Sequence, residues 1–284
     1  MYNKFFGFKE DPFSSTPDST FFYPSDQHRT ALDALTYAVK QRKGFVVITG
    51  PIGSGKTTVA RKLLRNLDAR VKTAVITNTS LSPKGILTMI LEDLGVEYKD
   101  GTKDKLLIQL NHYLLDQVME DNNVVVLVDE AQNLSPSCLE EIRMLSNLET
   151  DKEKLIQIVL LGQPELRKKL AMARLAQLRQ RVAVHYHLVP LNKAETKKYV
   201  LHRLNLVRAN GHGLDGLFND ECLELIYDYS QGVPRRVNIL CDHALLTAFV
   251  KDSPTITKEI IEEAIREIHF QGEETTHEQI YQSA

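Results

Sequence analysis

The segment from Gly50 to Thr57 limits what this chain can fold into more than any other feature. It reads G-x-x-x-x-G-K-T, follows the apolar run Phe45–Ile48 and leads into a helix-like stretch, Thr58–Leu67. A glycine-rich loop between a strand and a helix binds polyphosphates, because the loop amides and the positive end of the helix both face the anion. The alternative is a glycine-rich turn that matches by chance, which the flanking strand and helix disfavour. The sequence therefore predicts a nucleotide site.

Two side chains of this segment have expected tasks. Lys56 is expected to reach the β- and γ-phosphates, and Thr57 to offer its hydroxyl to Mg²⁺. The other residues expected to line the nucleotide are Gly50, Pro51, Ile52, Gly53, Ser54, Gly55 and Thr58.

Short β-branched runs alternate with amphipathic stretches up to residue 190. The strand candidates are Phe45–Ile48, Thr73–Thr77, Val124–Val128, Ile156–Leu161 and Val184–Leu188. This alternation is typical of a parallel sheet covered by helices on both faces, and the wholly apolar Val124–Val128 run predicts a central strand. The expected class is therefore α/β with five parallel strands.

The pattern changes after Pro190, where helices follow one another. Asn192 and Glu195 form a capping-box pattern before the first of four helix candidates. We expect residues 1–190, with their aromatic amino-terminal segment, to form the α/β core. Residues 191–270 are expected to form a helical lid, and residues 271–284 a polar tail that frays.

Polar residues follow two of the apolar runs. Asp129 and Glu130 end the Val124–Val128 run, where a parallel sheet binds its ligands. Asp129 is a candidate to hold the Mg²⁺ water shell and Glu130 to polarise an attacking water, the alternative being an acidic loop. Gln163, after the next run, is a candidate sensor of the γ-phosphate, and otherwise a turn glutamine.

Three arginines are candidates for phosphate contacts. Arg179 or Arg181, before the last strand run, would stabilise a transferring phosphoryl group, possibly on the nucleotide of a neighbouring subunit; surface salt bridging is the alternative. Arg235 lies in the first turn of a predicted helix, where positive charge is unfavourable unless an anion compensates it. The alternative for Arg235 is an exposed side chain without a phosphate.

Other patterns are weaker. His185 and His187 share one strand face, but no third metal ligand is evident, so packing or solvation is favoured. The stretch Asn192–Glu195 differs from the guanine-reading N-K-x-D in its last residue, which favours ATP over GTP.

Composition limits the compartments in which the protein is expected and the partners that it is expected to attract. A net charge of -2 gives no general attraction to nucleic acid or anionic membranes. The three cysteines are far apart, as expected in a reducing compartment, and the start is too polar for a signal peptide. No run approaches the roughly 20 apolar residues that span a bilayer. We therefore expect a cytoplasmic protein, which a partner would have to hold if it works at a membrane.

Several further stretches carry a recognisable pattern. They are Phe5–Phe13, Thr16–Asp18, Phe22–Tyr23, Val128–Leu134, Glu141–Asn147, Leu161–Leu166, Gln177–Arg181 and Gly232–Asn238. Together with the loop at Gly50, they make the chain resemble AAA+ ATPases, and more narrowly the general secretion pathway protein A (ExeA) family. The resemblance runs from about residue 2 to 265.

The resemblance implies Mg²⁺-dependent ATP hydrolysis by an oligomer with nucleotide at its subunit interfaces. Under it, Lys56, Thr57 and Asp129 bind nucleotide and metal. Glu130 is the catalytic base, and Gln163 stands at the position called sensor 1.

The family further implies an arginine finger in trans, supplied by Arg179 or Arg181, and a second sensor at Arg235. It implies service to an envelope-spanning secretion or pilus machine. The aromatic amino-terminal segment is expected either to pack near the adenine or to form ordinary core.

Two alternatives remain open at the level of sequence. Longer members of the family carry a membrane span and a peptidoglycan-binding region after the ATPase, and this sequence shows neither. We therefore expect it to match a shorter relative that serves a pilus or polysaccharide machine. Transposition target-selection ATPases of the MuB and TniB kind share the same core, so DNA is the second candidate partner. A helicase is disfavoured because only one phosphate loop is present.

Overall fold

The structure is a computed structural model of the chain, and it describes residues 2–16, 18–151, 153–208 and 216–281. Side chains are described as far as His269. The chain divides into two compact units. One is Asp26–Val189, and the other combines Met1–Ser25 with Pro190–Ala284.

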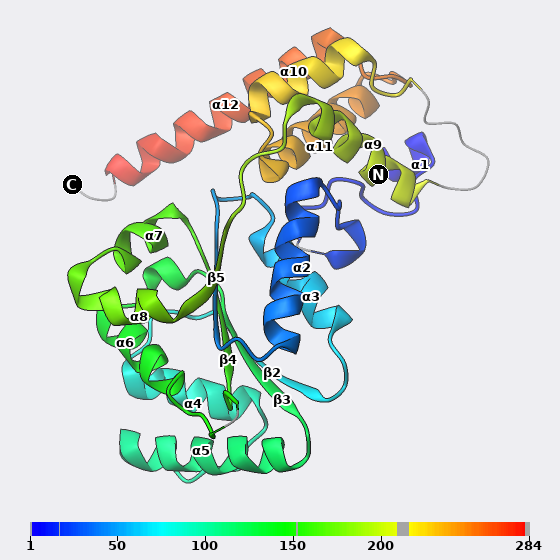
Figure 1. Cartoon of the computed structure of the whole chain (residues 1–284). Helices are drawn as coiled ribbons and strands as arrows, with labels where there is room; N and C mark the ends of the chain where they lie inside the picture. The colour runs from blue at the N-terminus through cyan, green and yellow to red at the C-terminus, as the bar shows by residue number, and fades with distance from the viewer. Residues whose placement is uncertain (1, 17, 152, 209–215, 282–284) are drawn as a thin grey trace. The chain divides into compact units, whose positions relative to one another are not determined.

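The Asp26–Val189 unit is built on a five-stranded sheet in which every pairing is parallel (Figure 1). The strand order is β2-β3-β4-β1-β5. The strands are β1 (Phe45–Thr49), β2 (Val71–Ile76), β3 (Asn123–Val128), β4 (Gln157–Gly162) and β5 (Val182–His187). This confirms the predicted fold class.

Burial follows the position of each strand in the sheet. Every residue of β1, β3 and β4 is buried, as continuous apolar runs require in a sheet covered on both faces. The edge strands β2 and β5 are only partly buried. Their starts lie two residues before the predicted ones, because the backbone of an edge strand pairs where its side chains are too exposed to give an apolar signal.

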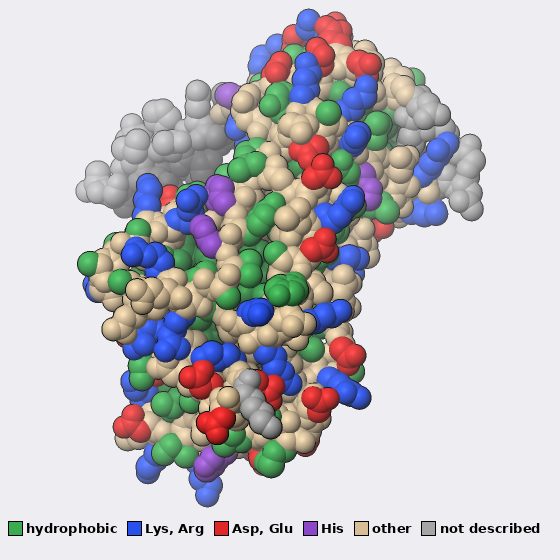
Figure 2. Space-filling model, in the orientation of Figure 1, with side chains coloured by type: hydrophobic (Ala, Val, Ile, Leu, Met, Phe, Trp, Pro, Cys, Tyr) green, Lys and Arg blue, Asp and Glu red, His purple; other side chains and the backbone are tan. Residues whose placement is uncertain are grey.

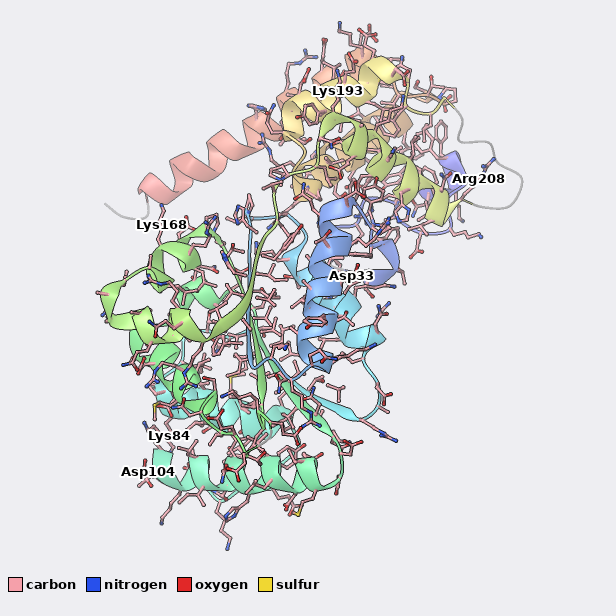
Figure 3. The ribbon with its side chains drawn as sticks, viewed as in Figure 1. Asp33, Lys84, Asp104, Lys168, Lys193 and Arg208 are labelled. Carbon is pink, nitrogen blue, oxygen red and sulfur yellow. The ribbon has the colours of Figure 1, made fainter. Side chains whose placement is uncertain are left out.

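Helices cover both faces of this sheet. The helices α2 (Asp26–Lys40) and α3 (Lys56–Asn66) pack together, and Figure 1 shows them opposite α4 (Pro83–Asp93) and α5 (Lys103–Met119). Lys84 and Asp104, labelled in Figure 3, mark the starts of α4 and α5. The remaining helical elements of the unit are η2 (Ala131–Asn133), α6 (Pro136–Leu145), α7 (Pro164–Leu170), η3 (Ala173–Leu175) and α8 (Ala176–Arg181). Alternate residues of each buried strand therefore meet different helices.

The second unit is helical. Its elements are α1 (Tyr2–Phe6), η1 (Ser19–Phe21), α9 (Lys193–Val207), α10 (Asp220–Ser230), α11 (Pro234–Val250) and α12 (Lys258–Tyr281). The predicted capping box at the start of α9 is present, since Glu195 N donates to Asn192 Oδ1 and Asn192 N to Glu195 Oε2. The four predicted helices after Pro190 are all found.

The amino-terminal aromatic segment belongs to the helical unit rather than to the α/β core, in contrast to the expected grouping of residues 1–190. Phe6, Phe8, Phe13 and Phe21 are buried in one apolar cluster with α9 to α12. The guanidinium of Arg203 on α9 lies 4.5 Å from the ring centre of Phe21. Core packing, one of the two expected roles, is therefore what these four rings show.

The carboxyl-terminal prediction was wrong in part. Helix α12 continues to Tyr281, whereas the sequence predicted a frayed tail from residue 271. No proline follows Lys258, and the helix continues through Gly272, a residue type that often ends helices. Residues 282–284 of the predicted tail lie outside the described residues, as does Pro17 of the amino-terminal pattern.

Candidate nucleotide-binding site

The phosphate loop, Asp129, Glu130 and Gln163 lie together at the carboxyl ends of the three central strands, whereas Arg179 and Arg181 lie on α8. Because β4 lies between β3 and β1, the carboxyl ends of these three strands are neighbours. Asp129 follows β3, Gln163 follows β4 and Gly50 follows β1. Gly50 N donates to Gly162 O at 3.2 Å, which joins the start of the loop to the end of β4.

The loop is held by close backbone approaches that only glycine allows. A Cβ on Gly50 would lie 2.7 Å from Ser54 Oγ and 2.9 Å from the carbonyl oxygen of Leu188. Gly55, the residue before α3, has a φ of 93°, and a Cβ there would lie 2.8 Å from His28 Nε2. Glycine at these positions therefore lets the loop fold tightly over the amino end of α3.

His28 on α2 supports this loop, a role that no sequence pattern predicted. Its Nε2 lies 2.9 Å from the carbonyl oxygen of Ser54, and its side chain is buried. Ser54 Oγ is itself buried and has no hydrogen-bond partner among the described residues. A buried hydroxyl without a partner inside a loop of this shape fits a site that is completed by a bound polar group.

Lys56 is the first residue of α3, and only 6% of it is exposed. Its Nζ donates to Gly50 O and Pro51 O, both at 2.9 Å. Burial lowers the pKa of Lys56, and the nearby carboxylates of Glu130 and Asp129 oppose that change. The ammonium is thus placed in the phosphate loop with carbonyl oxygens as its partners, which a phosphate oxygen can replace.

The donor set next to Lys56 fits Mg²⁺. Thr57 Oγ1 donates to Asp129 Oδ2 at 2.7 Å, so the oxygen lone pairs of the hydroxyl remain available to a cation. Hydroxyl and carboxylate oxygens are ligands that Mg²⁺ accepts, usually with phosphate oxygens and water. Among the described residues, no three His, Cys, Asp or Glu side chains form a metal cluster. The residues therefore suit a metal shared with a nucleotide.

Glu130 and Gln163, the predicted base and sensor, are in contact. Gln163 Nε2 donates to Glu130 Oε2 at 3.2 Å. The same oxygen accepts from Gln132 Nε2 at 2.5 Å. Gln132 was not among the predicted site residues, although its position two residues after Glu130 could have suggested a contact.

The two arginines of α8 differ in their surroundings. Arg179 is exposed, and its Nη1 donates to Ala171 O at 3.3 Å. Arg181 is half-buried, and its Nη1 donates to both the carbonyl oxygen and Oγ of Ser146 at 3.3 Å. Arg179 is therefore the more available of the two for a partner outside its own unit.

Arg235 belongs to the helical unit, where it is exposed in the first turn of α11. Its neighbour Arg236 stacks over the ring of Tyr229, with 5.0 Å between guanidinium carbon and ring centre. The second-sensor role of Arg235 stays a prediction.

The two histidines of β5 have a local partner. Thr49 Oγ1 lies 2.9 Å from His187 Nδ1 and 3.5 Å from His185 Nε2. Burial, followed by the charge of Arg167, lowers the pKa of both imidazoles. These contacts agree with the packing role favoured for the pair.

The sequence matches a known domain family and a known secretion protein. Residues 39–170 match a family described as an AAA domain. Over 257 residues the chain is 41% identical to general secretion pathway protein A of Aeromonas hydrophila. The match covers 90% of this chain and 46% of that protein, so the chain spans about half the length of this relative.

Solved structures of similar fold include an ORC protein and a RuvB protein. The ORC2 protein of Aeropyrum pernix, in ADPNP and ADP complexes, superposes with a TM-score of 0.68 at 18% identity, covering 92% of this chain and 72% of that one. The RuvB branch migration motor of Thermotoga maritima gives 0.59 at 19% identity, covering 90% and 72%. At this identity the likeness shows the fold alone.

Within the described residues, no helix combines the length and the apolar character needed to cross a bilayer.

Proposed function

The chain is an AAA+ P-loop protein related to general secretion pathway protein A, and we propose on this basis that it hydrolyses ATP with Mg²⁺ as an oligomer. The observation that supports this most is the contact series at the sheet edge. It joins Thr57 to Asp129 and Glu130 to Gln163 beside the buried ammonium of Lys56.

Each residue then has a task that its contacts permit. The amides from Gly50 to Thr57 and the ammonium of Lys56 bind the phosphates. Thr57 and Asp129 would hold Mg²⁺, which would supply neutralisation of the phosphate charge. Glu130 accepts a proton from the attacking water, and Gln163 orients that carboxylate and the water.

Oligomerisation is part of the proposal because nothing in the described contacts of Arg179 uses its charge. A guanidinium on an exposed helix end can reach the phosphates of a neighbouring subunit. Arg235 would act as the second sensor from the helical unit. The role of Arg179 requires an assembled form in which nucleotides lie at subunit interfaces.

We propose an envelope machine, of the secretion, pilus or polysaccharide-export type, as the client. The support is the 41% sequence identity to general secretion pathway protein A, in a match that covers 90% of this chain. The protein would work in the cytoplasm, held at the inner membrane by a protein partner. DNA as a partner has weaker support, because the net charge is -2 and basic and acidic side chains are interspersed on the face shown in Figure 2.

One experiment tests the activity. ATP turnover is measured with Mg²⁺ for the wild type and for Lys56→Ala and Glu130→Gln, together with nucleotide affinity and oligomer size. Lys56→Ala should lose ATP binding, whereas Glu130→Gln should keep binding, lose turnover and retain an ATP-bound oligomer. Wild-type turnover by Glu130→Gln would remove Glu130 from its role. Turnover that rises with DNA and falls steeply with salt would favour the DNA-associated alternative.

A further inference from the structure

We propose that Gln132 is a positioning residue that holds the carboxylate of Glu130 for catalysis, an inference that depends on the proposed ATPase function. Its side-chain amide bridges two strand ends. Oε1 accepts from the backbone N of Gln163 at 3.0 Å, and Nε2 donates to Glu130 Oε2 at 2.5 Å. Only 9% of Gln132 is exposed, so water competes little for these bonds.

The orientation of this amide is determined by its neighbours. The backbone N–H of Gln163 can only donate, so the amide oxygen of Gln132 must face it. The NH₂ group then faces Glu130, where it can donate only to an acceptor. The amide of Gln132 therefore holds Glu130 Oε2 through its NH₂ group while its oxygen stays with the backbone N of Gln163.

Glu130 needs such support because its backbone is strained. Its φ of 51° lies in the left-handed region, which is unfavourable for a residue with a side chain. Glu130 N donates to Asp129 Oδ1 at 2.9 Å, which holds one end of the strained residue. The amide of Gln132 holds the other end, at the carboxylate.

The backbone around Gln132 is fixed from α7. Lys169 Nζ donates to Gln132 O at 2.5 Å and to Leu134 O at 2.8 Å, which ties η2 to that helix. The neighbouring Lys168, labelled in Figure 3, marks α7. Gly162 leaves room for the bridge, since a Cβ there would lie 3.1 Å from Gln132 Oε1. A side chain anchored on both sides can transmit position to Glu130.

The bridge leaves one carboxylate oxygen of Glu130 for chemistry. Oε2 accepts from both Gln132 and Gln163, whereas Oε1 accepts no hydrogen bond from the described residues. By holding Oε2, Gln132 fixes the position of Oε1, the oxygen proposed to accept the proton of the attacking water.

Three variants test the inference. Gln132→Met keeps the length of the side chain and removes both hydrogen bonds. Gln132→Glu keeps the acceptor for Gln163 N and puts a second carboxyl group beside Glu130. Gln157→Met is the matched control, because Gln157 is also a buried bridge, with Oε1 accepting from Gly44 N and Nε2 donating to Lys154 O, at the opposite end of β4. Steady-state kcat, KM for ATP and thermal unfolding are measured from about pH 5.5 to 9, where carboxyl pairs and imidazoles titrate.

Gln132→Met should lower kcat about 10- to 100-fold with KM changed less than about twofold, as loss of an orienting partner does. Gln132→Glu should come closest to wild-type kcat at acidic pH, where a protonated carboxyl at position 132 can donate to Glu130. Its kcat relative to wild type should fall as the pH rises and the pair loses its shared proton. Gln157→Met should lower the unfolding temperature and leave kcat and its pH profile unchanged.

Two results would overturn the inference while the ATPase proposal stands. One is wild-type kcat in Gln132→Met, and the other is a pH-independent ratio of Gln132→Glu to wild type. If Gln132→Met does not fold, Gln132→Glu decides alone. Absence of turnover in the wild type would instead refute the proposed function and, with it, this inference.

Discussion

The different surroundings of Arg179 and Arg181 predict which of them is the arginine finger. Arg179 is exposed at the end of α8 with one bond at 3.3 Å to a backbone oxygen. Arg181 is bound twice to Ser146, at the end of α6. We therefore expect Arg179→Ala to impair catalysis and Arg181→Ala to impair mainly stability.

The magnitudes separate the two roles. An arginine finger contributes a factor of about 10³ to 10⁵ in kcat, whereas truncation of an exposed side chain changes the free energy of unfolding by less than about 0.5 kcal/mol. The two bonds of Arg181 are long, at 3.3 Å each. They contribute together about 1 kcal/mol, which corresponds to about 2 to 4 °C in unfolding temperature.

Mixing two inactive proteins tests whether the finger acts in trans. Lys56→Ala should not bind ATP but keeps Arg179, whereas Arg179→Ala binds ATP but lacks the finger. In oligomers mixed at equal amounts, about one site in four pairs an intact nucleotide site with an intact finger, so turnover should recover to about a quarter of wild type. Arg181→Ala serves as the control for stability, and its kcat should stay within about tenfold of wild type.

Three outcomes would refute this reasoning. Near-wild-type kcat in Arg179→Ala, with a loss of about 10³ in Arg181→Ala, would exchange the two assignments. Recovery absent from mixtures that are shown to form joint oligomers would place the finger in cis. Full turnover by a monomer, with no dependence on oligomer size, would show that no arginine finger acts between subunits.

Two further predictions concern the loop lysine and the helical unit. Because burial lowers the pKa of Lys56 below its value of 10.5 in the unfolded chain, the unfolded state binds more protons between the two values. The free energy of unfolding measured in urea should therefore rise with pH in that window for the wild type relative to Lys56→Met, and an equal slope in both proteins would contradict the buried position. Gly232→Ala should destabilise the helical unit by about 2 kcal/mol or more, because Gly232 has a φ of 71° and a Cβ there would lie 1.8 Å from Leu191 O. Circular dichroism against temperature checks this, and an unchanged unfolding temperature would show that the backbone adapts.

Local patterns were sufficient for the sheet, the loop and most helices. The apolar run of β3 predicted a central strand because a buried strand in a parallel sheet has no polar face. Asn192 and Glu195 predicted the start of α9 because a capping box needs only residues three apart. The polar residues after the runs of β3 and β4 were predicted as site candidates one by one, and the structure shows that two of them, Glu130 and Gln163, are in contact.

Contacts between distant residues could not be predicted in this way. Ser146, which binds Arg181, and His28, which supports the loop, are far from their partners in sequence. The aromatic amino-terminal segment was assigned to the wrong unit because aromatic spacing shows that rings are buried but not against which helices. The first two residues of each edge strand, β2 and β5, were missed because their side chains are partly exposed.

The two adjacent acids of the site differ in how many of their oxygens the protein uses, and this supports their different roles. Both oxygens of Asp129 are engaged, Oδ2 by Thr57 Oγ1 and Oδ1 by the backbone N of Glu130. Glu130 has only Oε2 engaged. A carboxylate whose two oxygens both accept hydrogen bonds from the protein leaves less access for an attacking water than one with an oxygen available. These contacts support the proposed roles of Glu130 as the base and Asp129 as the metal contact, and Asp129→Asn should weaken Mg²⁺-dependent nucleotide binding where Glu130→Gln does not.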